Sequence, residues 1–492
     1  MSKLNAATKN SSAKTQNMDG NDAYIMTPKT ELLTRVATCF WNEPKFYGEK
    51  NEESEKIVDL AKRVSEKDVA YVFKLAAYCR NVLNLRTVSV VLFDIAANAK
   101  SEKSTGLARK YAPHVIKRAD EITEALAYQF ATYGGKKAMP NGMRRALGRC
   151  FASFDAYAFG KYSRDGKVKL RDALRILHPK PSDKARSKLY KSILDGTLES
   201  PDTWEVMISS KGSTTENWDA AAKVMPYFAT LRNARNCLDH GCNMKPILER
   251  LEDKNLVHKS RLLPFRFWAA YNSIRGNSNP FTGATMGAIG KAMDYSLDNV
   301  PDLSGVTAVI IDHSGSMDDK LSEKSDLKRK DAADVLAAII RSKSRLNVVV
   351  EFANDARFMN LADHGVAANV EAIQRNSLSG GTCTEKAFEL LTGPRGVKHI
   401  DRIILLTDEQ DNVGTAQAGW TLARKAYPGV KLYLVDLAGY GTSQIAPQNG
   451  VVKLAGFSEK ILNFISLSET GFDAMAKAVE KWEPKKAETE DD

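Results

Sequence analysis

Three short side chains that offer oxygen ligands follow an apolar run in the second half of the chain. Residues 308–311 are all apolar, which is typical of a buried strand, and Asp312, Ser314 and Ser316 come directly after them. Carboxylate and hydroxyl oxygens favour a hard divalent cation such as Mg²⁺ over zinc or copper. The spacing therefore predicts a metal site, with a plain Ser/Gly-rich turn as the simpler alternative.

Two further ligands can be placed by the same reasoning. Thr382 follows a pair of glycines, and Asp408 follows closely on the apolar residues 403–406. In an open α/β sheet the carboxyl ends of the strands share one edge, where ligands bind. With only two carboxylates among its ligands, the ion would stay electrophilic and could accept the acid of a partner. The full set resembles the metal-ion-dependent adhesion site of von Willebrand factor A domains and consists of Asp312, Ser314, Ser316, Thr382 and Asp408.

Other residues in these loops compete for the same roles. Thr384 could be the threonine ligand, but the Gly-Gly-Thr context favours Thr382. His313 is bulky for this loop, and we expect its side chain to point to solvent rather than to bind the metal. A hydrolase built on Asp312-His313-Ser314 is disfavoured because consecutive residues point in different directions and the chain has no GxSxG elbow. We therefore expect no enzymatic activity.

Length and composition narrow the class of protein. The 492 residues are 43% hydrophobic and 27% charged, which is typical of a globular protein of two or three domains. The chain has no apolar run of the roughly 20 residues needed to cross a bilayer, and residues 1–21 lack the apolar core of a signal peptide. We expect a cytoplasmic monomer that does not bind membranes.

The six cysteines are scattered, and we expect them to be reduced thiols. Only Cys237 and Cys242 are close together, with His240 between them. A zinc site of the usual kind needs a second pair of ligands at a suitable spacing. This cluster therefore predicts packing at the end of a helix rather than metal binding.

Charge is distributed unevenly along the chain, whose net charge is +11. Residues 1–300 hold 48 Lys+Arg and 32 Asp+Glu, a net of +16. Residues 301–492 hold 23 Lys+Arg and 28 Asp+Glu, a net of −5. A surplus of this size predicts an anionic partner for the first part, and nucleic acid is the leading candidate.

The hydrophobic pattern changes near residue 296. From 27 to 295, apolar residues recur at helical spacing in short segments, among them 142–158 and 218–230, which predicts an α solenoid of stacked helix pairs. Ser65 to Asp68 could open one of these helices, with Asp68 in its first turn. From 296 to 482, β-branched runs alternate with helical segments, which predicts a doubly wound parallel sheet with helices on both faces. Residues 1–26 and 483–492 are polar and are expected to be disordered. Strands are expected at 306–311, 346–352, 402–406 and 430–437, and helices of this part at 331–342, 385–391, 416–426 and 471–482.

Basic residues are concentrated between 136 and 191, where 16 Lys+Arg accompany only 4 Asp+Glu. Basic side chains neutralise phosphates, and exposed aromatic rings can stack on unpaired bases. We expect the basic residues to bind an anion, with a solvated helix face as the alternative. The interleaved aromatic residues have the spacing of helical packing and are expected in the core: Phe151, Phe154, Tyr157, Phe159 and Tyr162. The candidate RNA-binding residues are Lys136, Lys137, Arg144, Lys161, Arg164, Arg171, Arg175, His178 and Lys180.

Several separated motifs resemble the TROVE module. They are Lys161-Tyr162 followed by residues 170–181, then residues 225–233, residues 263–267 and residues 81–87. A TROVE module followed by a von Willebrand A domain is the architecture of the Ro autoantigen family. The resemblance extends over residues 27–480, and we expect a bacterial or phage relative of that family.

The resemblance implies an architecture and a set of partners. Ro proteins are rings of HEAT-like helical repeats closed by the A domain. They bind small noncoding Y RNAs on a basic outer surface and take single-stranded 3′ ends of misfolded RNAs into the central hole. Bacterial relatives are linked to exoribonucleases. In the family, the Y RNA surface includes a lysine and a histidine that correspond to Lys161 and His178. It also includes a basic residue shortly after the lysine. Arg164 lies one place before that position, and this chain has Asp165 there.

Two assignments stay open on the sequence alone. His178 could contact RNA, or it could end a helix, where a cation is favoured. Arg232, Arg235 and Arg266 could line the hole of a ring, or they could pair with buried acids that hold adjacent repeats together.

We therefore expect a noncatalytic scaffold in RNA quality control or decay that binds Y-like RNA and the single-stranded ends of misfolded RNA. The alternative is a metal-dependent protein-interaction module with no RNA ligand. The charge of +16 on the first part favours the RNA-binding hypothesis, because a platform for peptides does not need it.

Overall fold

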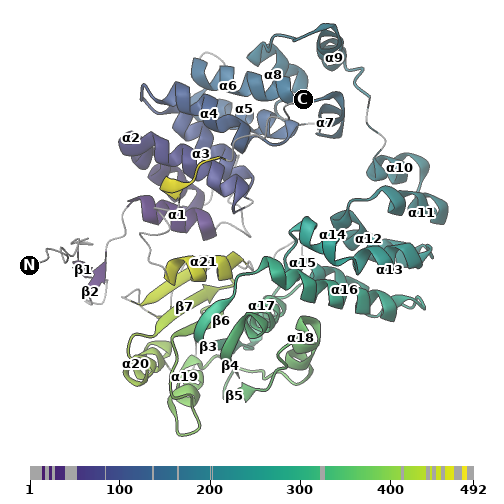
Figure 1. Ribbon diagram of the computed structural model, residues 1–492. Helices are drawn as coiled ribbons and strands as arrows, with labels where there is room; N and C mark the ends of the chain where they lie inside the picture. Colours follow the sequence, from purple (N-terminus) through teal and green to yellow (C-terminus); the bar gives the residue numbers. More distant parts are fainter. Residues whose placement is uncertain are drawn as a thin grey trace, which may run out of the picture. The chain divides into compact units, whose positions relative to one another are not determined.

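The computed structural model divides the chain into two compact units (Figure 1). The N-terminal helical unit consists of Thr27–Ser210 and Leu467–Asp492, and the sheet-containing unit consists of Met1–Met26 and Lys211–Ser466. No helix among the described residues is both long and apolar enough to cross a membrane. The described residues are 14–16, 22–24, 28–38, 52–83, 85–135, 138–162, 166–199, 201, 203–321, 327–411, 415–438, 444–445, 450–455, 460–469 and 479–484.

The N-terminal helical unit is built of helices that pack against helices one or two places away in the sequence, as α2 does with α3 and α4 does with α6. Its interior contains the ring of Phe73, which packs against Phe93 and Tyr111 with centroids 5.6 and 6.2 Å away. The helices are α1 Pro28–Thr38, α2 Glu52–Asn81, α3 Thr87–Asn98, α4 Ser104–Val115, α5 Ala119–Tyr133, α6 Asn141–Ser153, α7 Ala156–Tyr162, α8 Leu170–Leu177, α9 Lys184–Asp195 and α10 Trp204–Lys211.

Helix α2 is kinked at Asp68, near the point where the sequence predicts the start of a helix. The backbone of Asp68 is non-helical, with φ −148° and ψ 79°. Its Oδ1 accepts a hydrogen bond from the backbone N–H of Tyr71 at 3.1 Å, as a residue that caps a helix does. Asp68 itself therefore takes the capping position, whereas the sequence predicts that the helix starts at Ser65, with Asp68 in its first turn.

The sheet-containing unit begins with six further helices. A single helix expected over 218–230 is two, because Pro226 has no N–H and its ring disfavours helical backbone at the residue before it. The expected helix over 142–158 is likewise divided, between α6 and α7. The six helices are α11 Thr215–Val224, α12 Tyr227–Asp239, α13 Met244–Leu251, α14 Lys254–Ser260, α15 Pro264–Ile274 and α16 Thr282–Ser296.

A six-stranded sheet follows, in the order β5-β4-β3-β6-β7-β8. All neighbouring strands are parallel except β5, which is antiparallel to β4. The register pairs Asp312 with Phe352 and Ile311 with Leu406, so the carboxyl ends of β3, β4 and β6 share one edge. The strands are β3 Leu303–Asp312, β4 Ser344–Phe352, β5 Ala356–Met359, β6 Arg402–Thr407, β7 Lys431–Asp436 and β8 Val451–Ala455.

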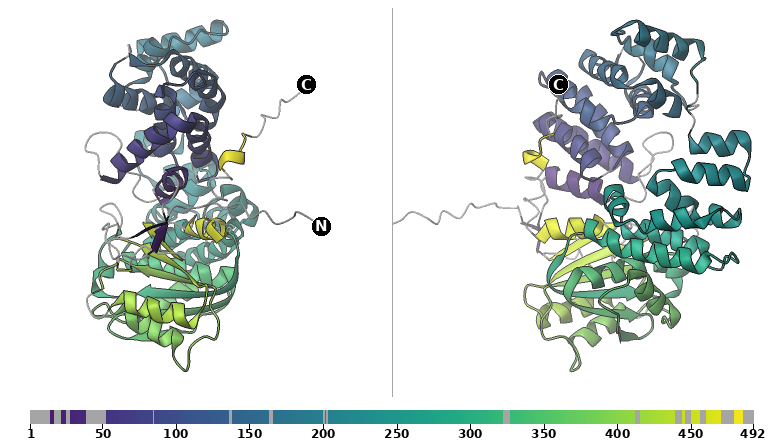
Figure 2. Two further views of the ribbon diagram at one scale, coloured as in Figure 1. Left: turned by 90° about the vertical axis from the view of Figure 1, so that its left-hand side faces the viewer. Right: turned by 45° about the vertical axis from the view of Figure 1, so that its right-hand side comes forward.

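Helices cover both faces of this sheet, as alternating strands and helices predict (Figure 2). Phe388 of α19 and Trp420 of α20 belong to one core cluster with Ile310 and Leu405 of the strands. Helix α17 contacts β3 and β4. The helices are α17 Arg329–Lys343, α18 Val366–Arg375, α19 Thr384–Thr392, α20 Ala416–Ala426 and α21 Lys460–Glu469.

Several elements differ from the sequence-based expectation. The short elements β5, α18, β8 and α21 were not predicted. Within segment 1–26, expected to be disordered, the strands β1 Lys14–Gln16 and β2 Asp22–Tyr24 form an antiparallel pair. Of the helix expected over 471–482, only 479–482 are described.

The helices next to the sheet are fastened to it by polar contacts within the sheet-containing unit. Tyr271 donates a hydrogen bond to Glu371 at 2.8 Å, and Arg275 lies 3.3 Å from the same carboxylate. Asp294 accepts from the backbone N–H of Val366 at 3.0 Å. Helices α15 and α16 therefore pack with α17 and α18, on the other side of the domain boundary expected at 295/296.

Candidate functional sites

The expected metal-binding loop follows β3 directly. Asp312 and Ser314 are buried, and Ser316 is half-buried. The backbone N–H of Ser314 donates to Asp312 Oδ1 at 2.8 Å, and the two serine hydroxyl oxygens lie 3.4 Å apart. Thr407, at the end of β6, donates to Asp312 Oδ2 at 2.6 Å. The turn thus holds the carboxylate and both hydroxyl groups together.

A second loop, which contains the Gly-Gly-Thr motif, is tied to the first by its backbone. Gly315 N–H donates to the Gly380 carbonyl at 3.0 Å. Gly380 has φ +127°, and a Cβ there would lie 2.3 Å from Asn354 Nδ2, so only glycine fits. Thr382 is buried beyond it. Thr384 instead donates to Gln444 at 3.4 Å, and it begins α19.

Asp408 follows β6 and is fully buried. Its Oδ2 accepts a hydrogen bond from Arg329 Nη1 at 3.2 Å, and the same nitrogen donates to the Ser316 carbonyl at 3.2 Å. Arg329 also lies 3.3 Å from Asp319. A guanidinium from the first turn of α17 therefore links two of the expected metal-binding positions, which the sequence did not indicate.

The charge and burial of the expected metal ligands suit a divalent cation. Burial raises the pKa of Asp312 to about 6, against the hydrogen bonds from Thr407 and Ser314 that lower it. A buried carboxylate with a raised pKa lacks compensating positive charge, and a hard cation supplies it. The donors are all carboxylate or hydroxyl oxygens, so the residues present fit Mg²⁺.

The expectation that His313 points to solvent is wrong. Its side chain is buried between Glu351 Oε2 at 2.7 Å and Asp334 Oδ1 at 2.8 Å. Burial alone would lower the His313 pKa, but the two carboxylates outweigh it and raise the pKa to about 9. The imidazolium donates from both nitrogens, so His313 fastens the metal-binding loop to β4 and α17. The two carboxylates belong to Asp334 and Glu351, which are distant from His313 in the sequence.

Helix α8 presents the exposed part of the basic region. Leu170, Leu174 and Leu177 are buried, whereas Arg171 and Arg175 lie one turn apart on the exposed side. Lys180 is also exposed. None of the ion pairs among the described residues involves Arg175 or Lys180, so their charges remain available to an anion.

The other predicted RNA-binding residues differ in their surroundings. Lys161 is half-buried on α7. Arg144 is half-buried on α6, and its guanidinium donates to Asn141 at 3.1 Å. Lys136, Lys137 and Arg164 lie outside the described residues.

His178 ends α8, as one of its two alternatives requires. It adopts left-handed backbone, with φ 48° and ψ 52°, and its N–H donates to the Leu174 carbonyl. His178 is exposed to solvent, so an RNA contact is compatible with this position. Left-handed backbone costs a residue with a Cβ roughly 1–2 kcal/mol.

This geometry predicts that a His178→Gly variant is more stable than a His178→Ala variant by about 1 kcal/mol, because glycine adopts φ > 0 without strain. Urea unfolding followed by circular dichroism measures the stability difference. Equal stability would mean that His178 is not held in left-handed backbone in solution.

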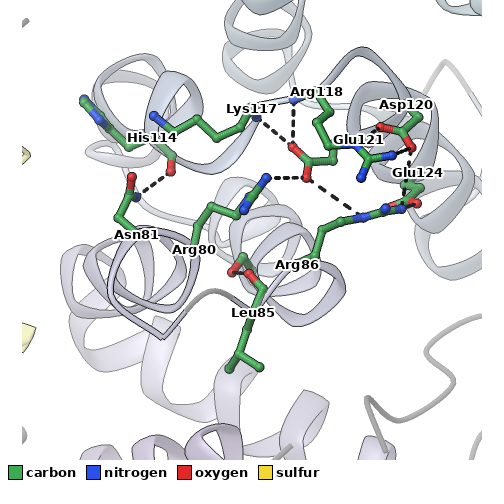
Figure 3. Close-up of polar contacts among 11 residues, drawn as sticks. Arg80, Asn81, Leu85, Arg86, His114, Lys117, Arg118, Asp120, Glu121 and Glu124 are labelled. Atoms are coloured by element: carbon green, nitrogen blue, oxygen red, sulfur yellow. Dashed lines mark hydrogen bonds and ion pairs between the residues drawn. The ribbon is translucent and has the colours of Figure 1, made fainter. Parts of the chain in front are cut away.

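Basic residues around the α4–α5 turn are neutralised internally (Figure 3). Glu121 is fully buried and accepts from Arg80 at 2.8 Å and from the backbone N–H groups of Lys117 and Arg118 at 2.7 and 3.0 Å. Arg118 also donates twice to Asp120, at 2.9 and 2.6 Å.

The same network contains Arg86 of the predicted TROVE segment 81–87. Arg86 pairs with Glu124 and lies 3.9 Å from Glu121. Three arginines therefore face three acids. This cluster is structural, and little uncompensated positive charge remains on it to bind phosphates. Asn84 of the same segment lies outside the described residues.

Arg232 and Arg235 are not paired with buried acids in the contacts that the structure gives for the described residues. Arg232 and Arg235 are exposed on α12. Arg232 lies 5.7 Å from the centroid of the Phe228 ring, and Arg235 lies 4.0 Å from the exposed Asp239. Arg266 is exposed on α15. The pairing hypothesis is therefore wrong for Arg232 and Arg235.

Cys237, His240 and Cys242 lie at the end of α12, where helix-end packing was expected. Both thiols are free and buried, and burial raises their pKa values, to about 12 for Cys237 and about 11 for Cys242. His240 Nδ1 bonds the Asn236 carbonyl at 2.8 Å, and Nε2 lies 2.9 Å from the Ser213 hydroxyl. Both imidazole nitrogens are used within the fold, which confirms the packing role.

Comparison with known proteins identifies a family whose model matches this chain and a crystal structure with a similar fold. The model of the TROVE domain matches residues 8–196 and 186–284. The crystal structure of the RO (RSR) protein of Deinococcus radiodurans superimposes with a TM-score of 0.67 at 17% identity. That likeness covers 91% of this chain and 99% of the other, so the two chains share a fold over nearly their whole length.

The curated relatives match only part of this chain in sequence. Telomerase protein component 1 of Mus musculus is 23% identical over 357 residues, which is 54% of this chain. The protein of the same name from Rattus norvegicus is 22% identical over the same length. The matched region spans 14% of the length of these relatives.

Proposed function

Because this chain belongs to the TROVE domain family, a family of RNA-binding proteins, we propose that it binds a small noncoding Y-like RNA. The observation that carries the proposal is the exposed basic surface on and after α8, formed by Arg171, Arg175, His178 and Lys180. None of the ion pairs given for the described residues involves Arg175 or Lys180, in contrast to Arg80, Arg86 and Arg118, which pair with acids of α5. Phosphate neutralisation then supplies most of the affinity.

The proposed role is that of a noncatalytic scaffold in RNA quality control or decay. In this proposal the helical repeats close into a ring with the sheet domain, and single-stranded ends of misfolded RNA enter the hole. An exoribonuclease is the partner that would act on such RNA. The likeness of fold to the Deinococcus RO (RSR) protein supports this architecture.

The sheet domain supplies the second half of the proposal. We assign it as a von Willebrand A domain whose loops after β3, α18 and β6 hold a Mg²⁺ ion. Asp312, Ser314, Ser316, Thr382 and Asp408 would ligate it. When bound, the ion offers an open position to the carboxylate of an acidic protein partner. RNA, which is itself anionic, is expected at the basic helical surface rather than at this site.

The RNA proposal is tested with a Lys161→Ala, His178→Ala double variant. We expect weaker binding to a structured Y-like RNA in filter-binding titrations. For about six phosphate contacts, the wild-type slope of log affinity against log salt should be roughly −4 to −5, and it should become less steep in the variant. Lys62→Ala, at an exposed site on α2, is the control and should bind like the wild type.

Unchanged affinity of the double variant would remove Lys161 and His178 from the RNA site. Absence of any RNA binding by the wild type at low salt, together with no RNA in the purified protein by its 260/280 absorbance ratio, would favour the metal-dependent protein-interaction module.

A further inference from the structure

Tyr157 is the exception among the aromatic residues expected in the core. Phe151 and Phe159 are fully buried, and Phe154 and Tyr162 are half-buried. Tyr157 is 52% exposed, and none of the ring–ring contacts among the described residues includes it. A ring exposed to this extent is accessible to a partner outside the fold.

The surroundings of Tyr157 are cationic. Lys161 follows one turn later on α7, and its Nζ lies 5.6 Å from the centroid of the Tyr157 ring. The same nitrogen lies 5.8 Å from the Tyr162 ring, over which Arg118 is placed at 4.2 Å. Two tyrosine rings and two cations thus alternate along this surface, within the N-terminal helical unit.

Only one of these cations is free to meet an anion. Arg118 is held by the two oxygens of Asp120, at 2.9 and 2.6 Å. Lys161 has no carboxylate partner among the described residues. An exposed ring beside one uncompensated positive charge matches a nucleotide, whose base stacks on a ring while its phosphate needs a cation.

Helix α7 is held firmly enough to act as a platform. A Cβ on Gly160 would lie 2.6 Å from the Glu199 carbonyl and 2.8 Å from Pro201, so the helix backbone packs directly on that segment. The Phe159 ring, on the opposite side of the turn, is anchored 4.6 Å from the Phe151 ring. The position of Tyr157 is therefore set by the core.

We propose that Tyr157 is a stacking platform for an unpaired base of the bound RNA, with Lys161 on the adjacent phosphate. The inference rests on the proposed RNA-binding function and adds the kind of nucleotide that this part of the surface takes. A base inside an A-form helix is stacked on its neighbours and cannot lie on Tyr157, so the platform selects a single-stranded segment.

Other exposed aromatic residues provide a comparison. Phe228, 37% exposed on α12, pairs with Arg232 in the same i, i+4 arrangement. Phe281 is 48% exposed, and no cation lies over its ring among the described residues. Phe281→Ala is therefore the matched control for loss of an exposed ring without a basic neighbour.

The test uses two RNA probes, a blunt-ended duplex without a loop and the same duplex with an unpaired 3′ extension that carries 2-aminopurine. Tyr157→Ala should weaken binding of the extended RNA about tenfold and leave the blunt-ended duplex unaffected. It should also abolish the quenching of 2-aminopurine fluorescence on binding. Tyr157→Phe keeps the ring and should retain both affinity and quenching. The salt dependence should be unchanged in Tyr157→Ala but shallower by about 0.7–0.9 in Lys161→Ala.

Each outcome distinguishes the platform from the function on which it rests. If the wild type binds neither RNA, the proposed RNA-binding function fails. If the wild type binds RNA and Tyr157→Ala binds the extended probe equally well, the platform is wrong while the function stands. An equal loss in Tyr157→Phe or in Phe281→Ala would also overturn the platform, because the effect would then not come from stacking on this ring.

Discussion

Replacement of Glu121 by alanine is expected to lower the free energy of unfolding of the N-terminal helical unit by about 3–5 kcal/mol. Glu121 is fully buried, and its two oxygens accept from Arg80 and from two backbone N–H groups at the start of α5 (Figure 3). Its removal leaves the half-buried guanidinium of Arg80 and two backbone N–H groups without their acceptor. Urea unfolding followed by circular dichroism measures the loss.

Two variants sharpen this experiment. Glu121→Gln keeps an acceptor oxygen for the backbone groups but loses the charge, so its stability should lie between wild type and Glu121→Ala. Glu102→Ala removes an exposed glutamate of the same unit and should change stability by no more than about 0.5 kcal/mol. If Glu121→Ala were as mild as Glu102→Ala, the network around Arg80 would not stabilise this unit.

Replacement of Asp312 by alanine is expected to abolish Mg²⁺ binding and to leave RNA affinity unchanged. Asp312 is buried at the end of β3, and we propose it as a direct ligand of the ion. Mutation of a residue that only hydrogen-bonds to a metal ligand typically lowers metal affinity about 10–100-fold. Loss of a ligand itself should therefore lower the affinity by more than this. Isothermal titration with Mg²⁺ measures the first effect and filter binding of RNA the second.

The result separates the two halves of the proposed function. Asp363→Ala removes an exposed carboxylate of the same domain that pairs with Arg341, and it should bind Mg²⁺ like the wild type. A wild-type protein that shows no heat of Mg²⁺ binding would rule out the metal site. Loss of RNA affinity in Asp312→Ala, with the fold intact, would contradict the division of labour between the sheet domain and the basic surface.

The elements predictable from sequence are those whose pattern is local and strong. The runs 306–311 and 402–406 were correctly assigned to β3 and β6, because residues 308–311 and 403–406 within them are buried and apolar throughout. Strand β5 has four residues and lies at an edge with partly exposed side chains. An edge strand needs no continuous apolar run, and its pairing with β4 is decided by neighbours elsewhere in the chain.

The same distinction applies to the sites. The positions of Asp312 and Asp408 after strands and the exposure of the basic residues of α8 could be predicted from the sequence, because both follow from local patterns. His313 could not be placed, because the acids that bury it, Asp334 and Glu351, are brought to it by α17 and β4.

By itself the sequence determined the change from helices to alternating strands and helices, the charge asymmetry and the motifs of the family, since each depends on residues near one another in the chain. Only the tertiary structure decided which charges are available. Arg86 and Arg118 are consumed by acids of α5, whereas Arg175 and Lys161 are not. It also decided that Tyr157 is exposed while Phe159 is buried, because helical spacing sets the face of a side chain but not what packs against that face.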